Sequence, residues 1–243
     1  MSPDKNNWDD VLSLVEQVQQ YLTQLEPIMG PRINKDKAIV FIWIGLNDMG
    51  QYRKLNGKDF LETAERVNTP IFTEAIQPMY EKGFKNFVLF NLQPLDQSPS
   101  NQERKGKVES PSPTPEKIKD VNKMLDGLKK EYNKKLKDAK IELYDVNSLL
   151  TKMTKNPAKY GFTNTKGPDQ QFRTQAFNPD SSTNLELLRS YYWWDKVHLT
   201  SRVHQYIAED VRSFIATKWG TKVWEKPALT EDKAVTGSKF YRA

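Results

Sequence analysis

An acidic residue three positions before a histidine is the feature of this sequence most typical of catalysis. Asp195 and His198 lie just before a helical pattern that begins at Ser201. A carboxylate at this spacing can fold back onto the imidazole Nδ1, where it fixes the tautomer and stabilises the imidazolium, as the acid of a hydrolase triad does. The same spacing also fits a helix-start aspartate beside a surface histidine, so both interpretations stay open.

The chain contains two histidines and no cysteine. The lack of cysteine excludes a disulfide framework, a thiolate metal site and a cysteine nucleophile, and two histidines are too few for a histidine-rich metal cluster. Any imidazole chemistry must therefore use His198 or His204. Because His204 lies inside the last helical pattern, we expect it to be packed or exposed rather than reactive.

A second polar cluster, Gly45-Leu46-Asn47-Asp48, follows an apolar run over residues 38–44. A glycine here lets the backbone turn close to a ligand, and the amide of Asn47 can donate to a developing oxyanion. The alternative is an ordinary strand-to-loop turn closed by an Asx cap. The residues alone leave both possibilities open.

An alternation of strands and helices would position these residues. Unbroken apolar runs predict parallel strands covered on both faces, and a period of 3.6 predicts helices between them. The expected strands span 38–44, 86–92 and 141–146, and the expected helices span 8–25, 59–82, 115–136 and 201–219. This order is typical of an open α/β sheet, in which chemistry lies at the carboxyl ends of the strands. We expect one domain over residues 1–220 and a polar arm over 221–243.

The net charge of +6 is concentrated in one stretch. Residues 101–140 carry twelve Lys/Arg and seven Asp/Glu. Because acids interrupt the lysines of 117–140 and aromatics are few, a solvated helix face fits better than a nucleic-acid surface. No apolar run approaches the ~20 residues that span a bilayer. The first seven residues lack the apolar core of a secretory signal, so localisation stays open.

Together the two clusters resemble the third and fifth sequence blocks of the SGNH (GDSL-type) ester hydrolases. These blocks are Gly-x-Asn-Asp after a strand and Asp-x-x-His-x-Thr before the last helix. The strand and proline-rich loop over 87–99, and the segment over 156–195, are similar to the fungal acetylesterase and lipase-like branch. The resemblance covers roughly residues 11–216.

The resemblance implies a three-layer α/β/α, flavodoxin-like hydrolase fold whose first strands are missing from this chain. It implies that His198 is the general base, Asp195 its orienting acid, and Asn47 with Gly45 the oxyanion and substrate-binding element. The substrate would be a small ester or an acetylated carbohydrate. Neither a metal nor an organic cofactor is implied, because side chains supply all the chemistry.

The chain departs from the family pattern at the nucleophile. The Gly-Asp-Ser block and the block with the oxyanion glycine are absent, and Leu199 replaces the usual proline after the histidine. Asp180-Ser181 and Gly237-Ser238 lack the apolar strand that precedes the family's serine. No nucleophile is identified, so we expect weak or no activity from the isolated chain. The alternative is a non-catalytic binding or interaction protein with the same fold.

The missing first strand has a structural consequence. In the family's architecture it lies beside the Gly-x-Asn-Asp strand, so its absence would leave Ile39–Ile44 at an open edge. An open apolar edge is a template for pairing with another chain. Either a second copy, a partner chain or a terminal segment covers it, or the chain on its own is fragile.

Overall fold

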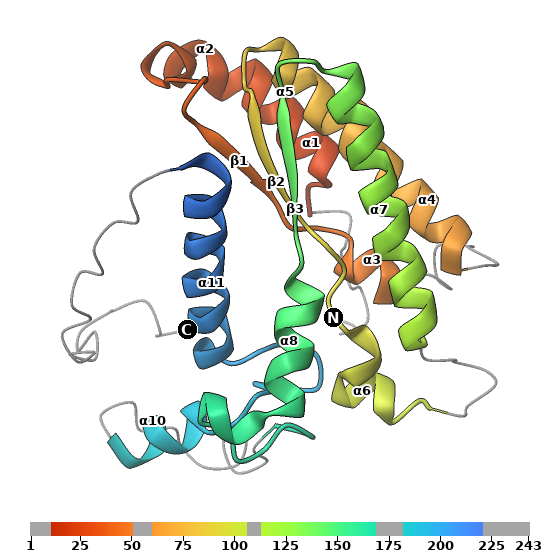
Figure 1. Cartoon of the computed structure of the whole chain (residues 1–243), viewed down its shortest axis with the longest axis vertical. Helices are drawn as coiled ribbons and strands as arrows, with labels where there is room; N and C mark the ends of the chain where they lie inside the picture. Colours follow the sequence, from red (N-terminus) through yellow and green to blue (C-terminus); the bar gives the residue numbers. More distant parts are fainter. Residues whose placement is uncertain (1–10, 51–59, 106–112, 169–181, 221–243) are drawn as a thin grey trace, which may run out of the picture. The chain divides into compact units, whose positions relative to one another are not determined.

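A computed structural model describes residues 11–50, 60–105, 113–168 and 182–220 (Figure 1). The chain divides into two compact units. The first comprises residues 1–96 and 113–147, and the second comprises residues 97–112 and 148–243. The single domain expected over 1–220 stays a prediction, and the arm expected over 221–243 lies outside the described residues.

The first unit is built on a three-stranded parallel sheet. Its strands β1 (Ile39–Ile42), β2 (Asn86–Phe90) and β3 (Lys140–Tyr144) are hydrogen-bonded in the order β1-β2-β3. Each strand stops two residues before its apolar run ends, because residues such as Leu92 and Val146 continue into the core beyond the last strand pairing. The sheet confirms the predicted fold class, an α/β fold with parallel strands.

Helices alternate with these strands and occupy most of the remaining described chain. Those around the sheet are α1 (Leu14–Gln20), η2 (Tyr21–Leu25), α2 (Glu26–Met29), η3 (Gly30–Arg32), α3 (Leu46–Gly50), α4 (Phe60–Pro70), η4 (Ile71–Ile76), α5 (Gln77–Glu81) and α7 (Pro115–Lys135). Those that follow or interrupt them are η5 (Leu95–Gln97), α6 (Pro99–Gln102), α8 (Val146–Lys155), η6 (Pro157–Tyr160), α10 (Ser182–Arg189) and α11 (Ser201–Trp219). Among the described residues, none of these helices has the length and apolar character needed to cross a membrane.

The first helix begins later than its periodicity predicted. A capping box holds its start, because Ser13 Oγ accepts from the Glu16 N–H and the Glu16 carboxylate accepts from the Ser13 N–H. The helix expected from residue 8 therefore begins at Leu14 among the described residues.

The core of the first unit lies between the sheet and the helices on one side of it. Alternate strand residues, including Ile42, Phe87, Leu89 and Ile141, face α1, η4 and α7, as strand geometry requires. Figure 1 shows α1, α4, α5 and α7 grouped together beside the three strands. Packing against this layer fixes the carboxyl ends of β1 and β2. The turn at Gly45 follows the carboxyl end of β1.

Strand β1 is the edge of the described sheet. Within the described residues its backbone pairs only with β2, and Phe41, Trp43 and Ile44 are exposed. Trp43 stacks on Phe90 of β2 with the ring centroids 4.9 Å apart. The described sheet therefore ends at the strand that the sequence placed at an open edge.

Candidate active site

Gly45 makes the turn that follows β1. Its φ of +91° is a conformation that side-chain-bearing residues rarely adopt, and a Cβ at this position would lie 3.2 Å from Val67 Cγ1. The carbonyl of Gly45 accepts from the Met49 N–H at 3.0 Å, which starts the short helix α3. Asn47 therefore lies in the first turn of α3, with its side chain exposed.

The turn borders a small cavity within the first unit. The cavity has a volume of about 20 Å³ and is lined mainly by apolar side chains of β1, β2, α4 and α7, together with Gly45. The side chain of Asn68 also lines it and is 6% exposed, and its Nδ2 has no hydrogen-bond partner. A void of this size is sufficient for one water molecule.

Hydrogen bonds of asparagine side chains connect the residues that follow the carboxyl ends of β2 and β3. Asn91 Nδ2 donates to Asp145 Oδ1 at 2.7 Å, and Asn91 Oδ1 accepts from the Asn147 N–H at 3.0 Å. Asn122 on α7 bonds both the N–H and the carbonyl of Leu92, at 2.7 and 2.9 Å. Asn91 lies within the strand expected over 86–92, but its partners depend on strand register, which the sequence pattern did not supply.

In the second unit, the loop over residues 191–200 is anchored by buried side chains. Tyr192, Trp193 and Thr200 are buried. Trp193 Nε1 donates to the Thr165 carbonyl at 2.9 Å, and Thr200 Oγ1 donates to the Tyr191 carbonyl at 2.8 Å. Thr200 is also the N-cap residue of α11, so Asp195 does not cap that helix.

Asp195 and His198 form a closely coupled pair in this loop. Asp195 Oδ1 accepts from the backbone N–H groups of Val197 and His198, both at 2.7 Å, and Oδ2 lies 2.7 Å from His198 Nδ1. Partial burial raises the pKa of Asp195, but the hydrogen bonds from His198 and Val197 outweigh it and hold that pKa below the ordinary value.

The charge of Asp195 determines the tautomer of His198. An ionised carboxylate only accepts hydrogen bonds, so Nδ1 of His198 must carry the hydrogen, and in the neutral ring the lone pair is then on Nε2. The imidazole is 73% exposed, and no serine hydroxyl of the described chain contacts it. The arrangement can accept a proton at Nε2 and stabilise the resulting imidazolium.

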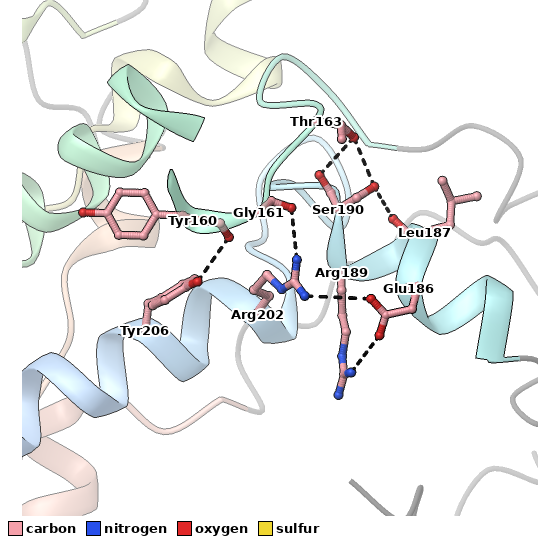
Figure 2. Close-up of polar contacts among 9 residues, drawn as sticks. All are labelled: Tyr160, Gly161, Thr163, Glu186, Leu187, Arg189, Ser190, Arg202 and Tyr206. Atoms are coloured by element: carbon pink, nitrogen blue, oxygen red, sulfur yellow. Dashed lines mark hydrogen bonds and ion pairs between the residues drawn. The ribbon is translucent and has the colours of Figure 1, made fainter. Parts of the chain in front are cut away.

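A second set of polar contacts holds the segments on either side of this loop (Figure 2). Arg202, at the start of α11, donates from Nη1 to the Gly161 carbonyl at 3.0 Å, and its Nη2 lies 4.0 Å from Glu186 of α10. Tyr206 donates to the Tyr160 carbonyl at 3.3 Å. These contacts join η6, α10 and α11. The loop over 191–200 therefore connects two helices, α10 and α11, that are held by side-chain contacts.

The loop is also tethered to α6. The backbone N–H of Ser100 donates to the Lys196 carbonyl at 3.0 Å, and Lys196 Nζ lies 2.8 Å from Glu103 Oε1. Lys196 is the residue between Asp195 and Val197. The contact therefore restrains the backbone at the centre of the Asp-x-x-His motif.

The structure brings together the members of each cluster that the sequence singled out. Gly45 and Asn47 share one turn in the first unit, and Asp195 and His198 share one loop in the second. The convergence of the two clusters stays a prediction. His204 is exposed on α11, and Asp180-Ser181 and Gly237-Ser238 lie outside the described residues. Within the described ranges no group of acidic or histidine side chains could hold a metal ion.

Comparisons with known proteins agree on one family. Residues 5–211 match the family model described as GDSL-like lipase/acylhydrolase. The chain is 26% identical over 190 residues to GDSL esterase/lipase 2 of Arabidopsis thaliana, covering 71% of this chain and 50% of that protein. It is 24% identical over 221 residues to the thermolabile hemolysin of Vibrio parahaemolyticus, covering 84% and 47%.

A shorter match involves an acetylesterase. The chain is 33% identical over 92 residues to the acetylesterase of Thermothelomyces thermophilus, covering 37% of this chain and 29% of that protein. The chain spans about half the length of the plant and Vibrio relatives that it matches.

Proposed function

Because the chain belongs to the family of GDSL-like lipases and acylhydrolases, we propose that it supplies the acid–base and oxyanion-binding groups of a carboxylic-ester hydrolase. The substrate class we propose is acetyl or short-chain acyl esters, as the name of the Thermothelomyces relative suggests. The observation that carries the proposal is the 2.7 Å contact between Asp195 Oδ2 and His198 Nδ1.

His198 is the general base in this proposal. As a hydroxyl oxygen bonds to the ester carbonyl carbon, its proton passes to Nε2 and the carbonyl oxygen becomes an oxyanion. When the tetrahedral intermediate collapses, the ester C–O bond breaks and the proton passes from Nε2 to the leaving alcohol. Asp195 stabilises the imidazolium between these two steps.

Asn47 is the proposed oxyanion donor. A preorganised amide donor aimed at the developing oxyanion contributes about 10²–10³ in rate in other hydrolases. The positive φ of Gly45 and the immediate start of α3 support this role, because they place Asn47 in a fixed turn at the carboxyl end of a parallel strand.

The attacking hydroxyl is not assigned to a residue of this chain. The family's Gly-Asp-Ser block has no counterpart in the sequence. We propose that a second polypeptide supplies this hydroxyl and pairs with the open edge of β1, where Phe41 and Trp43 are exposed. A second copy of the chain would cover the edge but would lack the same block. The isolated chain is then expected to hydrolyse esters weakly.

Hydrolysis of p-nitrophenyl acetate and labelling by a fluorophosphonate test the proposal. We expect slow hydrolysis that His198→Ala abolishes, whereas His204→Ala, which removes the other histidine, retains it. Fluorophosphonate labelling followed by peptide mapping would locate the attacking hydroxyl. A folded protein with neither turnover nor labelling would contradict catalysis by this chain and support the non-catalytic binding protein.

A further inference from the structure

The aromatic run before Asp195 separates into packed and exposed members. Tyr192 and Trp193 are buried, with Trp193 3% exposed, and their rings contact edge-to-face at 5.0 Å. Trp194 is 52% exposed. Packing of this loop therefore accounts for Tyr192 and Trp193, but it leaves most of the Trp194 indole in contact with solvent.

Backbone pairing places Trp194 opposite the proposed base. Trp193 and Leu199 form an antiparallel bridge, and the Trp194 N–H donates to the His198 carbonyl at 2.8 Å. Residues opposite each other in such a pair project from the same face, with Cβ atoms about 4.5–5.5 Å apart. Trp194 and His198 therefore lie opposite each other at the exposed end of this loop, next to the buried pair of Trp193 and Leu199.

The two charged residues that follow Trp194 in the chain already have partners. Asp195 is bonded to His198, and Lys196 is paired with Glu103. Val197, the residue before His198, is also an exposed apolar side chain. The loop that carries the exposed imidazole therefore also presents two exposed apolar side chains, Trp194 and Val197. Apolar side chains suit a hydrocarbon chain better than sugar hydroxyls, which need hydrogen-bond partners.

We propose that Trp194 is a specificity-determining residue that contacts the hydrocarbon portion of an ester while His198 acts at its carbonyl. The inference rests on the proposed function, because it assigns a substrate contact to the same site. The hydrocarbon belongs either to the acyl group or to the alcohol. Esters with a chain of several carbons on that side are then preferred over those without one.

Binding of 1-octanol, measured by NMR titration of the whole chain, tests the contact without any turnover. We expect Trp194→Ala to weaken octanol binding about tenfold or more, as removal of a large buried apolar contact would. We expect Trp194→Phe to restore part of the affinity. The matched control is Trp43→Ala, because Trp43 is 39% exposed and lies in the other unit. Ethanol, the short analogue, is expected to bind equally weakly to all variants.

Hydrolysis distinguishes the two possible sources of the hydrocarbon. If Trp194→Ala selectively loses hydrolysis of p-nitrophenyl octanoate and retains that of p-nitrophenyl acetate, the hydrocarbon that contacts Trp194 is the acyl chain. If the variant selectively loses hydrolysis of octyl acetate, the hydrocarbon belongs to the alcohol. Absence of hydrolysis in the wild type would defeat the proposed function, but octanol binding would still decide the role of Trp194. Unchanged octanol affinity in Trp194→Ala, no octanol binding by the wild type, or an equal loss in Trp43→Ala would overturn the inference.

Discussion

The carboxylate of Asp195 holds His198 at two points, its backbone and its ring. Oδ1 accepts from the His198 N–H and Oδ2 lies against His198 Nδ1, both at 2.7 Å. Such a two-point attachment fixes the ring relative to the chain before any substrate arrives. In the proposed reaction the site would then have little reorganisation left to make, and such preorganisation is a main source of enzymatic rate enhancement.

Replacement of Asp195 by asparagine is expected to disturb the tautomer of His198 with little change in shape. The asparagine NH2 would donate to Nδ1, and the hydrogen of the neutral ring would then move to Nε2, where the base must accept a proton. We expect kcat/KM for p-nitrophenyl acetate to fall by about two to four orders of magnitude. Asp138→Asn, which changes an exposed aspartate paired with Lys85, is the control. A loss of less than about tenfold in Asp195→Asn would show that Asp195 does not orient the base.

The lowered pKa of Asp195 also predicts how stability depends on pH. A carboxyl whose pKa is lower in the folded state stabilises the fold above its unfolded pKa, about 3.9 for aspartate, and this stabilisation is lost as the pH falls through the lowered value. The difference in urea midpoint between wild type and Asp195→Asn should therefore shrink as the pH falls below about 4. A difference that keeps growing as the pH falls below about 4 would contradict the assigned direction.

Replacement of Gly45 is predicted to destabilise the fold, because of its backbone conformation and because of the space around it. Alanine at a φ of +91° is strained, and its Cβ would crowd Val67. We expect Gly45→Ala to lower the free energy of unfolding by about 1–3 kcal/mol. Gly50→Ala, five residues later in the chain, is the comparison because a Cβ there meets nothing within 4 Å. Equal thermal stability of the two variants would argue against a constrained turn.

Much of the sheet and of the longer helices could be predicted from periodicity. The three strands overlap the predicted apolar runs. Helices α7 and α11 lie within a residue of their predicted bounds, because the apolar period of a long amphipathic helix is easy to recognise. Helix α3 has five residues, too few to show a period. Helix α8 carried a usable signal that the sequence interpretation left unused, since Val146, Leu150 and Met153 recur at four and three and are all buried.

The candidate site could be predicted only where its residues are close in the chain. Asp195 and His198 are three residues apart, so local geometry brings them together. The exposure of Trp194 beside buried Trp193 depends on an antiparallel bridge to Leu199, which composition does not reveal. The bond between Asn91 and Asp145 spans two strands and follows from the parallel register of β2 and β3.

The proposed function requires the turn bearing Asn47 and the loop bearing His198 to act on the same substrate carbonyl. The chain has no cysteine and only two histidines, so a nitroxide attached to Asn47→Cys is a single paramagnetic probe and the histidine ring signals are only two. We predict that this label broadens the His198 ring resonance strongly and that of His204 less. A His198 resonance left sharp in the labelled, folded protein would contradict the proposed function.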